Sequence, residues 1–399
     1  MMATENPIPD ISTPAKSAVT SLLVLLPAMQ PESLDRILSN LAHVNATLPG
    51  GGLLVATPDT PTESHPSLAI TQAPQTTPSW TLTAADFVNA YQLAEKNSAR
   101  AILILGSESA SLSPLALREL SGTVLSNVTD LAAPCYDLPP RAGLVNSAIL
   151  YPLTRALFAT RIRFPLTVDL GLSMRMAERL ANAAQRFTIS NQADAILWPV
   201  EEAMIAGFAI KEIDVGHRDL PQPAEGDFNA IMAKVVGSIF ADIDAKAAFW
   251  QRARALPLPR HPMARPYPSD GNADIASMLD SFRFAYTNLR EIWSLVLPPN
   301  SLLGLKRLTT TEAVEFRMPD NLWARIVYDF LVAYRLRTLN RGHLLGALIP
   351  LYLAWVASHI NIAASGTDAE RHIEAVAAAF EADKPYLVSR WRWPDRFNP

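Results

Sequence analysis

The sequence predicts an α/β protein: a mostly parallel sheet flanked by helices, followed by a C-terminal helical subdomain. Two observations predict it. In the first part of the chain, short apolar runs rich in β-branched residues alternate with amphipathic helical patterns, which is typical of a sheet covered on both faces. From Phe228 onward one helical pattern follows another. Hydrophobic residues make up 49% of the 399, enough for a core, and the length favours more than one domain.

The first elements form a strand, helix, strand unit. The apolar runs SLLVLLP (21–27) and GGLLVATPD (51–59) predict buried strands. Between them, 31–44 carries leucines at helical spacing, with a proline and acidic residues in its first turn.

The next elements continue the alternation. Residues 60–79 are rich in Thr, Pro and Ser and predict a long surface loop. A helix over 83–98, capped by Thr83, leads to a strand over 100–109 and a helix over 114–125.

Two acidic residues follow predicted strands. Ligands of such sheets bind beyond the carboxyl ends of the strands, so Asp59 and Glu108 are the first binding candidates. Glu108 could supply an oxygen ligand to a divalent cation, or it could be an exposed loop residue.

The C-terminal part reads as helices joined by a Pro-rich link over 260–274. Pro385 is expected to end the last helix. The predicted helices are 228–253, 275–296, 322–339 and 371–383. The predicted organisation is a tail (1–18), an α/β domain (19–227) and a helical subdomain (228–399).

The longest apolar run, 344–364, approaches the length of a membrane span. Pro350, His359 and Asn361 interrupt it. We therefore expect a pair of buried helices and no membrane span.

Charge and cysteine usage narrow the class of protein. Lys and Arg number 34 against 38 Asp and Glu, a formal charge of -4, which argues against nucleic acid or anionic membrane as partner. The single cysteine, Cys135, excludes an internal disulfide and suits a reducing compartment. With no signal pattern at its start, the chain is expected to be cytoplasmic.

The segment 151–171 gathers three arginines among apolar residues. Pro152 suits the first turn of a helix, and a cation such as Arg155 opposes the helix dipole there unless an anion is bound. Arg155 is thus an anion ligand or a solvated or salt-bridged side chain. Arg161 and Arg163 resemble ordinary surface charges.

Three further residues have two interpretations each. Asp169 is a turn residue bonded to its own backbone or, if buried, a base with a raised pKa. Asp194 precedes an apolar stretch, as a helix cap would. His217 follows a strand-like run and is more often structural than a ligand at such a place. Motifs of P-loops, dinucleotide-binding turns, nucleophile elbows and zinc proteases do not occur.

Three segments carry a resemblance to a known family. They are NSAILYPLTRALFATRIRFPLTVDLGLS (146–173), ADAILWPVEEAMIAGFAIKEIDVGHRDL (193–220) and FNAIMAKVVGSIFADID (228–244). They resemble bacterial retaining glycosyltransferases of the GT-A type, related to glucosyl-3-phosphoglycerate and mannosylglycerate synthases. The resemblance extends over nearly the whole chain and implies a Rossmann-like GT-A fold for the sheet.

The resemblance implies a nucleotide-diphosphate sugar as donor, contacted by Asp59 and Glu108. It also implies a divalent cation, Mg²⁺ or Mn²⁺, held by Glu108 and His217. Here the sequence departs from the family: GSES (106–109) keeps one acidic position of the Asp-x-Asp motif. Threonine and valine also replace paired glycines at 167–168.

On the acceptor side, the resemblance implies that Thr154 and Arg155 bind a small anionic acceptor such as glycerate or phosphoglycerate. Asp169 or Asp194 would orient the acceptor hydroxyl or act as its base. The acceptor residues persist while the donor motif is degenerate.

Two functions are compatible with these residues. The first is a glycosyltransferase; the second is a catalytically silent relative that binds a sugar nucleotide or acts as a regulatory or partner subunit. A nucleotidyltransferase would carry a Gly-rich loop where this chain has PAMQP (27–31). Self-association as a homodimer is left open.

Overall fold

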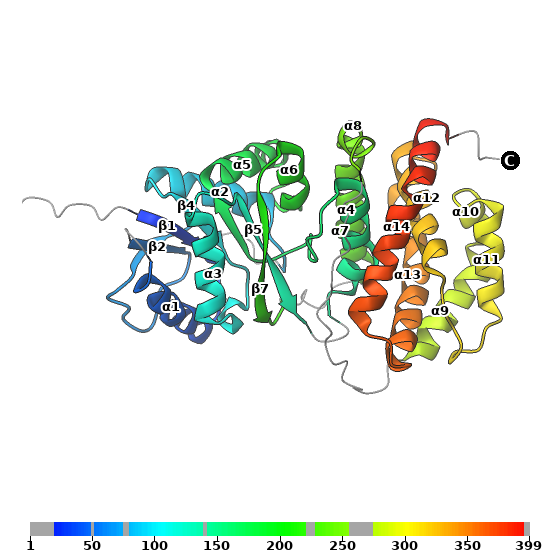
Figure 1. Cartoon of the computed structure of the whole chain (residues 1–399), viewed down its shortest axis with the longest axis horizontal. Coiled ribbons are helices and arrows are strands. Elements are labelled where there is room, and N and C mark those ends of the chain that lie inside the picture. Colours follow the sequence, from blue (N-terminus) through cyan, green and yellow to red (C-terminus); the bar gives the residue numbers. More distant parts are fainter. Residues whose placement is uncertain are drawn as a thin grey trace, which may run out of the picture.

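The computed structural model describes residues 20–48, 52–74, 80–138, 142–220, 228–254 and 274–394. The predicted tail and all but the last residue of the predicted Pro-rich link lie outside these ranges. The described residues form an α/β half and a helical half, which lie side by side (Figure 1).

Within the described residues, seven strands form one sheet in the order β3-β2-β1-β4-β6-β5-β7. All neighbouring strands are parallel except β6, which runs antiparallel to β4 and β5. The predicted mostly parallel sheet is confirmed. The strands are β1 (Thr20–Leu25), β2 (Gly52–Thr57), β3 (Ala69–Gln72), β4 (Ala101–Ile104), β5 (Leu131–Asp137), β6 (Leu170–Ser173) and β7 (Ile210–His217).

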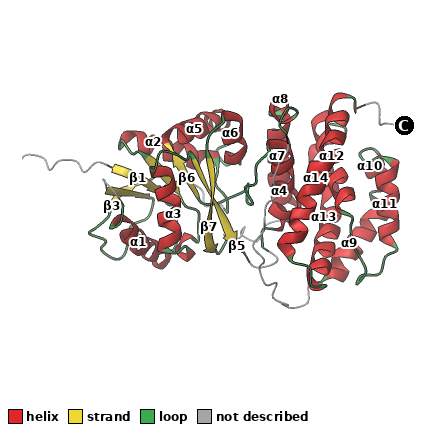
Figure 2. Cartoon of the chain, viewed as in Figure 1, coloured by secondary structure: helices red, strands yellow, loops and turns green. Residues whose placement is uncertain are grey.

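The helices divide between the two halves, and the predicted C-terminal helical region is present (Figure 2). The first six are α1 (Pro31–Asn45), α2 (Ala84–Lys96), α3 (Pro114–Leu125), α4 (Tyr151–Phe158), α5 (Met174–Ile189) and α6 (Pro199–Ala206). The others are α7 (Phe228–Ala245), α8 (Ala247–Trp250), α9 (Ile275–Asn288), α10 (Arg290–Ser294), α11 (Pro299–Thr309), α12 (Asp320–Leu336), α13 (Arg341–Ala364) and α14 (Ala369–Arg392). A 3-10 helix, η1 (Ser109–Ser111), and a π-helix, η2 (Asn146–Leu150), complete the set.

Burial explains which segments form the inner strands. Every residue of β1 and β2 after the first is buried, as is all of β4, which is typical of parallel strands covered on both faces. Helices α1 and α3 cover one face, and α2, α5 and α6 the other (Figure 1). The edge strand β3 is mostly exposed. Its sequence therefore lacks an apolar run, and the prediction of a loop over 60–79 did not include this strand.

The helical half includes a segment from the middle of the α/β sequence. Side chains of η2 and α4, including Ile149, Leu153 and Leu157, belong to the same apolar core as the helices from α7 onward. The Trp323 indole N–H of α12 donates to the Ala148 carbonyl at 2.7 Å. The domain boundary after 227 stays a prediction. The segment of η2 and α4 precedes this boundary in the sequence but packs with the helices that follow it.

Two helix predictions are wrong. The apolar run over 344–364 is one continuous helix, α13, and not a pair, although Pro350 lies inside it. It is long and apolar enough to span a membrane, but 78% of its most apolar window is buried inside the protein, as in a core helix. Helix α14 continues through Pro385 to Arg392. In both helices, tertiary packing outweighs the roughly 3 kcal/mol that an interior proline costs.

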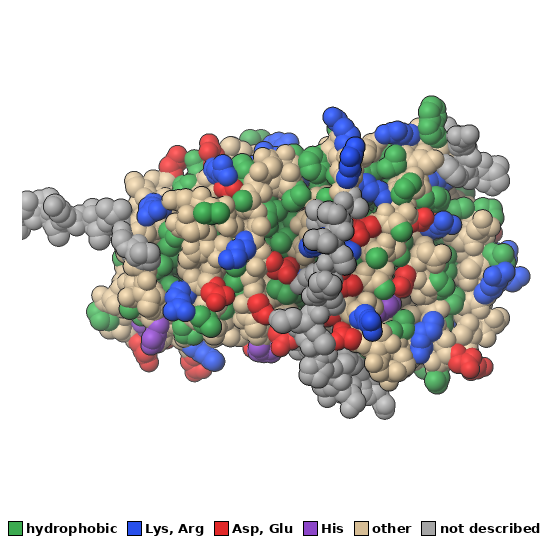
Figure 3. Space-filling view, viewed as in Figure 1, with side chains coloured by type: hydrophobic (Ala, Val, Ile, Leu, Met, Phe, Trp, Pro, Cys, Tyr) green, Lys and Arg blue, Asp and Glu red, His purple; other side chains and the backbone are tan. Residues whose placement is uncertain are grey.

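Charged side chains of both signs are interspersed over the face drawn in Figure 3. This distribution agrees with the formal charge of -4.

Candidate functional site

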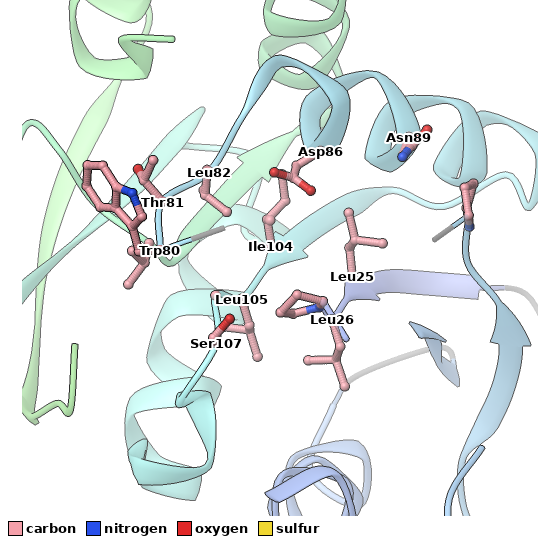
Figure 4. A pocket seen from close by; sticks show the side chains of 14 residues that line it. Leu25, Leu26, Trp80, Thr81, Leu82, Asp86, Asn89, Ile104, Leu105 and Ser107 are labelled. Carbon is pink, nitrogen blue, oxygen red and sulfur yellow. The ribbon is translucent and has the colours of Figure 1, made fainter. Parts of the chain in front are cut away.

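The carboxyl edge of the sheet holds a small cavity next to β1. The chain moves outward from β1 to β2 and β3 and then returns to β4 on the other side of β1; such switch points are where open α/β sheets bind ligands. The cavity measures about 30 Å³ and is lined by the ends of β1 and β4 and the start of α2 (Figure 4). It is far smaller than the roughly 300–1,000 Å³ of typical ligand sites.

Val168 closes this cavity on one side. A Cβ atom placed on Gly106 would lie 2.8 Å from the Val168 Cβ, so the segment before β6 packs directly on the end of β4. The polar side chains that line the cavity include Thr81, Asp86 and Asn89 (Figure 4). Sequence reasoning missed these three because nothing marks them before the fold is known.

The two predicted nucleotide-sugar ligands lie at this edge. Asp59 is half-buried and accepts the Met29 N–H at 2.8 Å, which ties the loop after β2 to the loop after β1. Glu108 is exposed and has a left-handed backbone, with φ of 62°. Such a conformation is uncommon for a residue other than glycine and is held by its surroundings.

Asp169 lies beside them but is fully buried in an ion pair with Arg218. The Arg218 Nε donates to Asp169 Oδ2 at 2.9 Å and Nη2 to Oδ1 at 3.2 Å. The Gly106 N–H and the Tyr136 hydroxyl donate to the same carboxylate, each at 3.1 Å. Four donors satisfy its oxygens. The carboxylate therefore does not bond to the backbone of its own turn, and its role as a base stays a prediction.

Arg218 extends this network to the loop after β4. Its Nη2 donates to the Ser107 carbonyl at 2.8 Å, and its Nη1 donates to the Asp219 carbonyl and to Ser111 Oγ. One buried guanidinium thus joins the loops that follow β4 and β7.

A bulge in β7 explains why Arg218 was missed. Ile213 and Val215 face the core, so the period of two predicts that position 217 faces inward next. The register against β5 shifts between Cys135 and Tyr136, and an extra residue in one strand reverses the facing of the residues after it. His217 therefore faces solvent, and Arg218 faces the core.

The predicted metal ligands are exposed. The His217 side chain is 62% exposed, and its Nε2 lies 3.0 Å from Asp219 Oδ1. In the described part of the chain, no group of three or more His, Cys, Asp or Glu side chains is arranged to hold a metal ion. One carboxylate and one imidazole would hold a cation only together with oxygens that the ligand supplies, because Mg²⁺ and Mn²⁺ favour oxygen ligands.

Thr154, predicted to bind the acceptor, is fully buried. Its hydroxyl donates to Glu201 Oε1 at 2.6 Å. Glu201 belongs to a buried polar group with Glu202, Asp242 and Lys246 at the junction of α6 and α7. Thr154 thus contributes to packing between helices.

Arg155 is held by carboxylates of α14. Its Nη1 donates to Glu374 and its Nη2 to Glu381 at 2.9 Å, and its side chain is 6% exposed. Because η2 precedes α4, Arg155 lies in the last turn of α4, where a cation suits the dipole. The first-turn argument from the sequence was wrong for this reason.

Arg163 is a buried ion-pair partner, which corrects its interpretation as a surface charge. Its guanidinium pairs with Glu370 of α14 at 2.9 Å and donates to Ser147 Oγ at 2.9 Å. Glu370 and Glu374 are one turn apart, and Glu381 lies two turns further, on one face of α14. These three glutamates and two arginines form an ionic interface, the α14 interface, between 151–163 and the last helix.

Asp194 is exposed and does not cap a helix, since α6 begins at Pro199. Lys234 lies 2.7 Å away and lowers the pKa of this carboxyl through a hydrogen bond and its charge. The Ala193 and Ala195 carbonyls accept from the first N–H groups of α2. Asp194 therefore lies beside the helix that forms one wall of the cavity.

The predicted site residues thus separate into two sets. Asp59, Glu108, Asp169 and His217 lie at the carboxyl edge of the sheet, whereas Thr154 and Arg155 lie in the packed junction with the helical half. Asp194 belongs to neither set and lies exposed beside α2. Their roles in binding and catalysis stay predictions.

Glu201 should make stability depend on pH. Burial, with the nearby Asp242 charge, raises the pKa of Glu201 to about 7. Because this pKa is higher in the folded chain than in the unfolded chain, protonation of Glu201 stabilises the fold at low pH. This stabilisation, on the order of 3 kcal/mol, is lost as the pH rises from about 4.5 through about 7. We expect Glu201→Gln to flatten the curve of unfolding free energy against pH in that window, measured by urea denaturation.

The matched control for this measurement is Glu178→Gln, an exposed carboxylate on α5. It should leave the pH curve unchanged. Equal curves for Glu201→Gln and the native chain would contradict the prediction.

Comparisons with known proteins assign no family. No protein-family model matches the chain, and a search of curated proteins finds no match. Glucosyl-3-phosphoglycerate synthase from Mycobacterium tuberculosis, in complex with Mn²⁺, UDP-glucose and phosphoglyceric acid, is 15% identical over 56% of this chain and 79% of that chain, with a TM-score of 0.35. CMP:2-keto-3-deoxy-manno-octonic acid synthetase complexed with CTP is 14% identical over 56% of this chain and 100% of that chain, with a TM-score of 0.30. TM-scores this low carry no argument about the function of this chain, which is therefore argued from its own side chains.

Proposed function

We propose that this chain binds a nucleotide-diphosphate sugar at the carboxyl edge of its sheet and does not transfer the sugar, as a catalytically silent relative of glycosyltransferases. One contrast carries the proposal. Of the residues predicted for the donor, Glu108 is exposed and Asp59 is half-buried. Those predicted for the acceptor, Thr154 and Arg155, are buried and already bonded to glutamates of the chain.

The charge of the edge indicates how a diphosphate would be bound. The described segments after β1, β2, β4 and β7 carry the acidic residues Asp59, Glu63, Glu108 and Asp219. Their one arginine or lysine, Arg218, is buried and paired with Asp169. An anionic diphosphate would be repelled by this edge. A divalent cation bound by Glu108 and His217 would neutralise the diphosphate charge.

The size of the cavity sets a further condition. About 30 Å³ holds no nucleotide sugar. In this proposal the ligand therefore lies over the open side of the edge, outside the cavity.

The second candidate function is an active glycosyltransferase, and the exposed carboxylate of Asp194 beside α2 favours it. In this reaction the bond between the sugar's anomeric carbon and the diphosphate oxygen breaks, and the acceptor oxygen bonds to that carbon. Asp194 takes the hydroxyl proton. Arg155 would bind the anionic acceptor only after release from Glu374 and Glu381.

We expect UDP-glucose, GDP-mannose or ADP-glucose to bind with Mn²⁺ and to bind at least about tenfold more weakly in EDTA, because the described residues of the edge offer no unpaired arginine or lysine. Glu108→Gln should reduce the Mn²⁺-dependent affinity by about tenfold. Calorimetric titration of the full chain measures both. Asp280→Asn, an exposed carboxylate on α9, is the matched control and should leave the affinity unchanged.

Two outcomes separate the candidates. Absence of binding for all three nucleotide sugars up to about 1 mM would refute nucleotide-sugar binding altogether. If the chain released free nucleotide in the presence of 3-phosphoglycerate or glycerate, and Asp194→Asn abolished this release, its function would be that of an active glycosyltransferase and not of a silent relative.

A further inference from the structure

Helices α13 and α14 meet at a buried pair of histidines, His359 and His372. Their two Nδ1 atoms lie 2.8 Å apart, within hydrogen-bond distance. The ring of Trp355, one turn before His359 on α13, is stacked on both imidazoles, with ring centroids 5.2 Å and 6.0 Å apart. Two titratable side chains thus share one hydrogen bond inside the protein.

The partners of the pair determine where its protons lie. His372 Nε2 lies 3.2 Å from Asp320 Oδ1 of α12. Because a carboxylate only accepts, His372 carries a proton on Nε2. In the neutral pair, His359 then donates from its Nδ1 to the unprotonated Nδ1 of His372. One additional proton, on His372 Nδ1, preserves the bond, since His359 Nδ1 becomes the acceptor.

A second additional proton leaves no such arrangement. Both Nδ1 atoms would then carry hydrogen, 2.8 Å apart and with no acceptor between them. Two positive charges would also lie side by side in a buried place. The contact therefore tolerates one positive charge, which Asp320 neutralises, and excludes two.

Charged groups of neighbouring segments surround the pair. Asp320 of α12 bonds to His372. Arg163, before β6, and Glu370, in the first turn of α14, are paired with each other and act on His359 in opposite directions. Helices α7 and α9 also pack on α13, but no charged group on either helix acts on His359. These surroundings compensate a single charge on the pair.

Burial, with the charges of His372 and Arg163, lowers the pKa of His359 to about 3, and the Glu370 carboxylate opposes this change. Arg317, before α12, lies further along and donates to the carbonyl two positions beyond His359. Because this pKa is lower in the folded chain than in the unfolded chain, the neutral imidazole stabilises the fold above about pH 6.5. This stabilisation is lost as the pH falls from about 6.5 to about 3.

We propose that the His359–His372 pair is a pH switch, which holds the start of α14 on α13 at neutral pH and releases it when acid protonates both imidazoles. The start of α14 also carries Glu370, so its release opens this end of the α14 interface. Later turns of α14 stay bound, because the Tyr328 hydroxyl of α12 donates to the Phe380 carbonyl at 2.7 Å, a bond that acid does not change. The switch is independent of nucleotide-sugar binding.

Hydrogen exchange of the full chain at pH 7 and pH 5, corrected for the intrinsic exchange rates, tests the switch. We expect the opening constant of peptides over 355–363 and 369–376 to rise about 20-fold from pH 7 to pH 5. Peptides over 378–392 should change less than about threefold. His359→Phe keeps a ring against Trp355 but takes no proton, so this rise should be lost.

His343→Gln is the matched control, because His343 is an exposed histidine of the same helix. It should keep the full rise. Nitrogen-15 spectra of the histidine side chains in the native chain provide a second measurement that needs no variant to fold. They should show His359 in its neutral form at pH 5.

Four results would overturn the inference. One is an unchanged opening constant in the native chain between pH 7 and pH 5, and another is an equal rise in the peptides over 378–392. A rise of the same size in His359→Phe is the third. The fourth is a His359 imidazole that titrates near pH 6.5 in the folded native chain, and this measurement decides if the variant does not fold.

Discussion

Replacing Arg218 with methionine should lower the free energy of unfolding of the α/β half by about 3–5 kcal/mol. The variant leaves the Asp169 carboxylate, 0% exposed, with no counter-charge. It also frees the Ser107 and Asp219 carbonyls from the guanidinium. Urea denaturation followed by far-ultraviolet circular dichroism measures the loss.

Two further variants serve as controls for this measurement: a surface arginine variant and a double variant that removes both charges of the ion pair. Arg118→Met removes an exposed arginine from α3 and should cost less than about 0.5 kcal/mol. Adding Asp169→Asn to Arg218→Met removes both charges and should recover part of the stability, because the penalty arises from one unpaired buried charge. A loss below about 1 kcal/mol for Arg218→Met would contradict the structural role of the pair.

Arg155→Met should destabilise the helical half by about 3 kcal/mol, because Glu374 and Glu381 would lose their guanidinium partner in a largely buried interface. It should leave nucleotide-sugar affinity unchanged, since Arg155 lies away from the carboxyl edge in the α14 interface. Tryptophan fluorescence reports the unfolding, and calorimetry reports the affinity.

Arg325→Met is the control for this interface. Arg325 also pairs with α14, through Asp383, but its side chain is 43% exposed, and exposed pairs contribute less than about 1 kcal/mol. If Arg155→Met kept its stability and instead lost binding of 3-phosphoglycerate, Arg155 would be the acceptor ligand that the family resemblance implies.

The alternation of apolar strands and amphipathic helices was enough to predict the sheet and many of its helices. The helix over 114–125 was predicted at its observed bounds, and Thr83 does cap α2 through a capping box with Asp86. Such local signals depend on residues within one or two turns. The edge strand β3 (AITQ) and the antiparallel strand β6 (LGLS) lack the uninterrupted apolar run of β4 (AILI), so neither was predicted.

The site could not be predicted to the same degree, because its contacts join distant parts of the sequence. Nothing near Arg155 indicates that Glu374 and Glu381, more than 200 positions later, would pair with it. His217 was predicted from the family resemblance, and nothing in the sequence marks Arg218, which faces the core because of a bulge that only the pairing with β5 reveals. Side-chain chemistry suggested which residues to consider, whereas burial and hydrogen-bond partners decide which of them stay accessible.

The α14 interface also determines the order in which the chain can complete its fold on the ribosome. Helix α4 and its neighbouring arginines emerge early, but their carboxylate partners lie in the last helix, separated by 207 to 226 positions. Contacts with such long sequence separation form late and slow folding. Until α14 is synthesised, the charges of Arg155 and Arg163 lack these partners, so the packing around α4 is completed only after α14 has emerged.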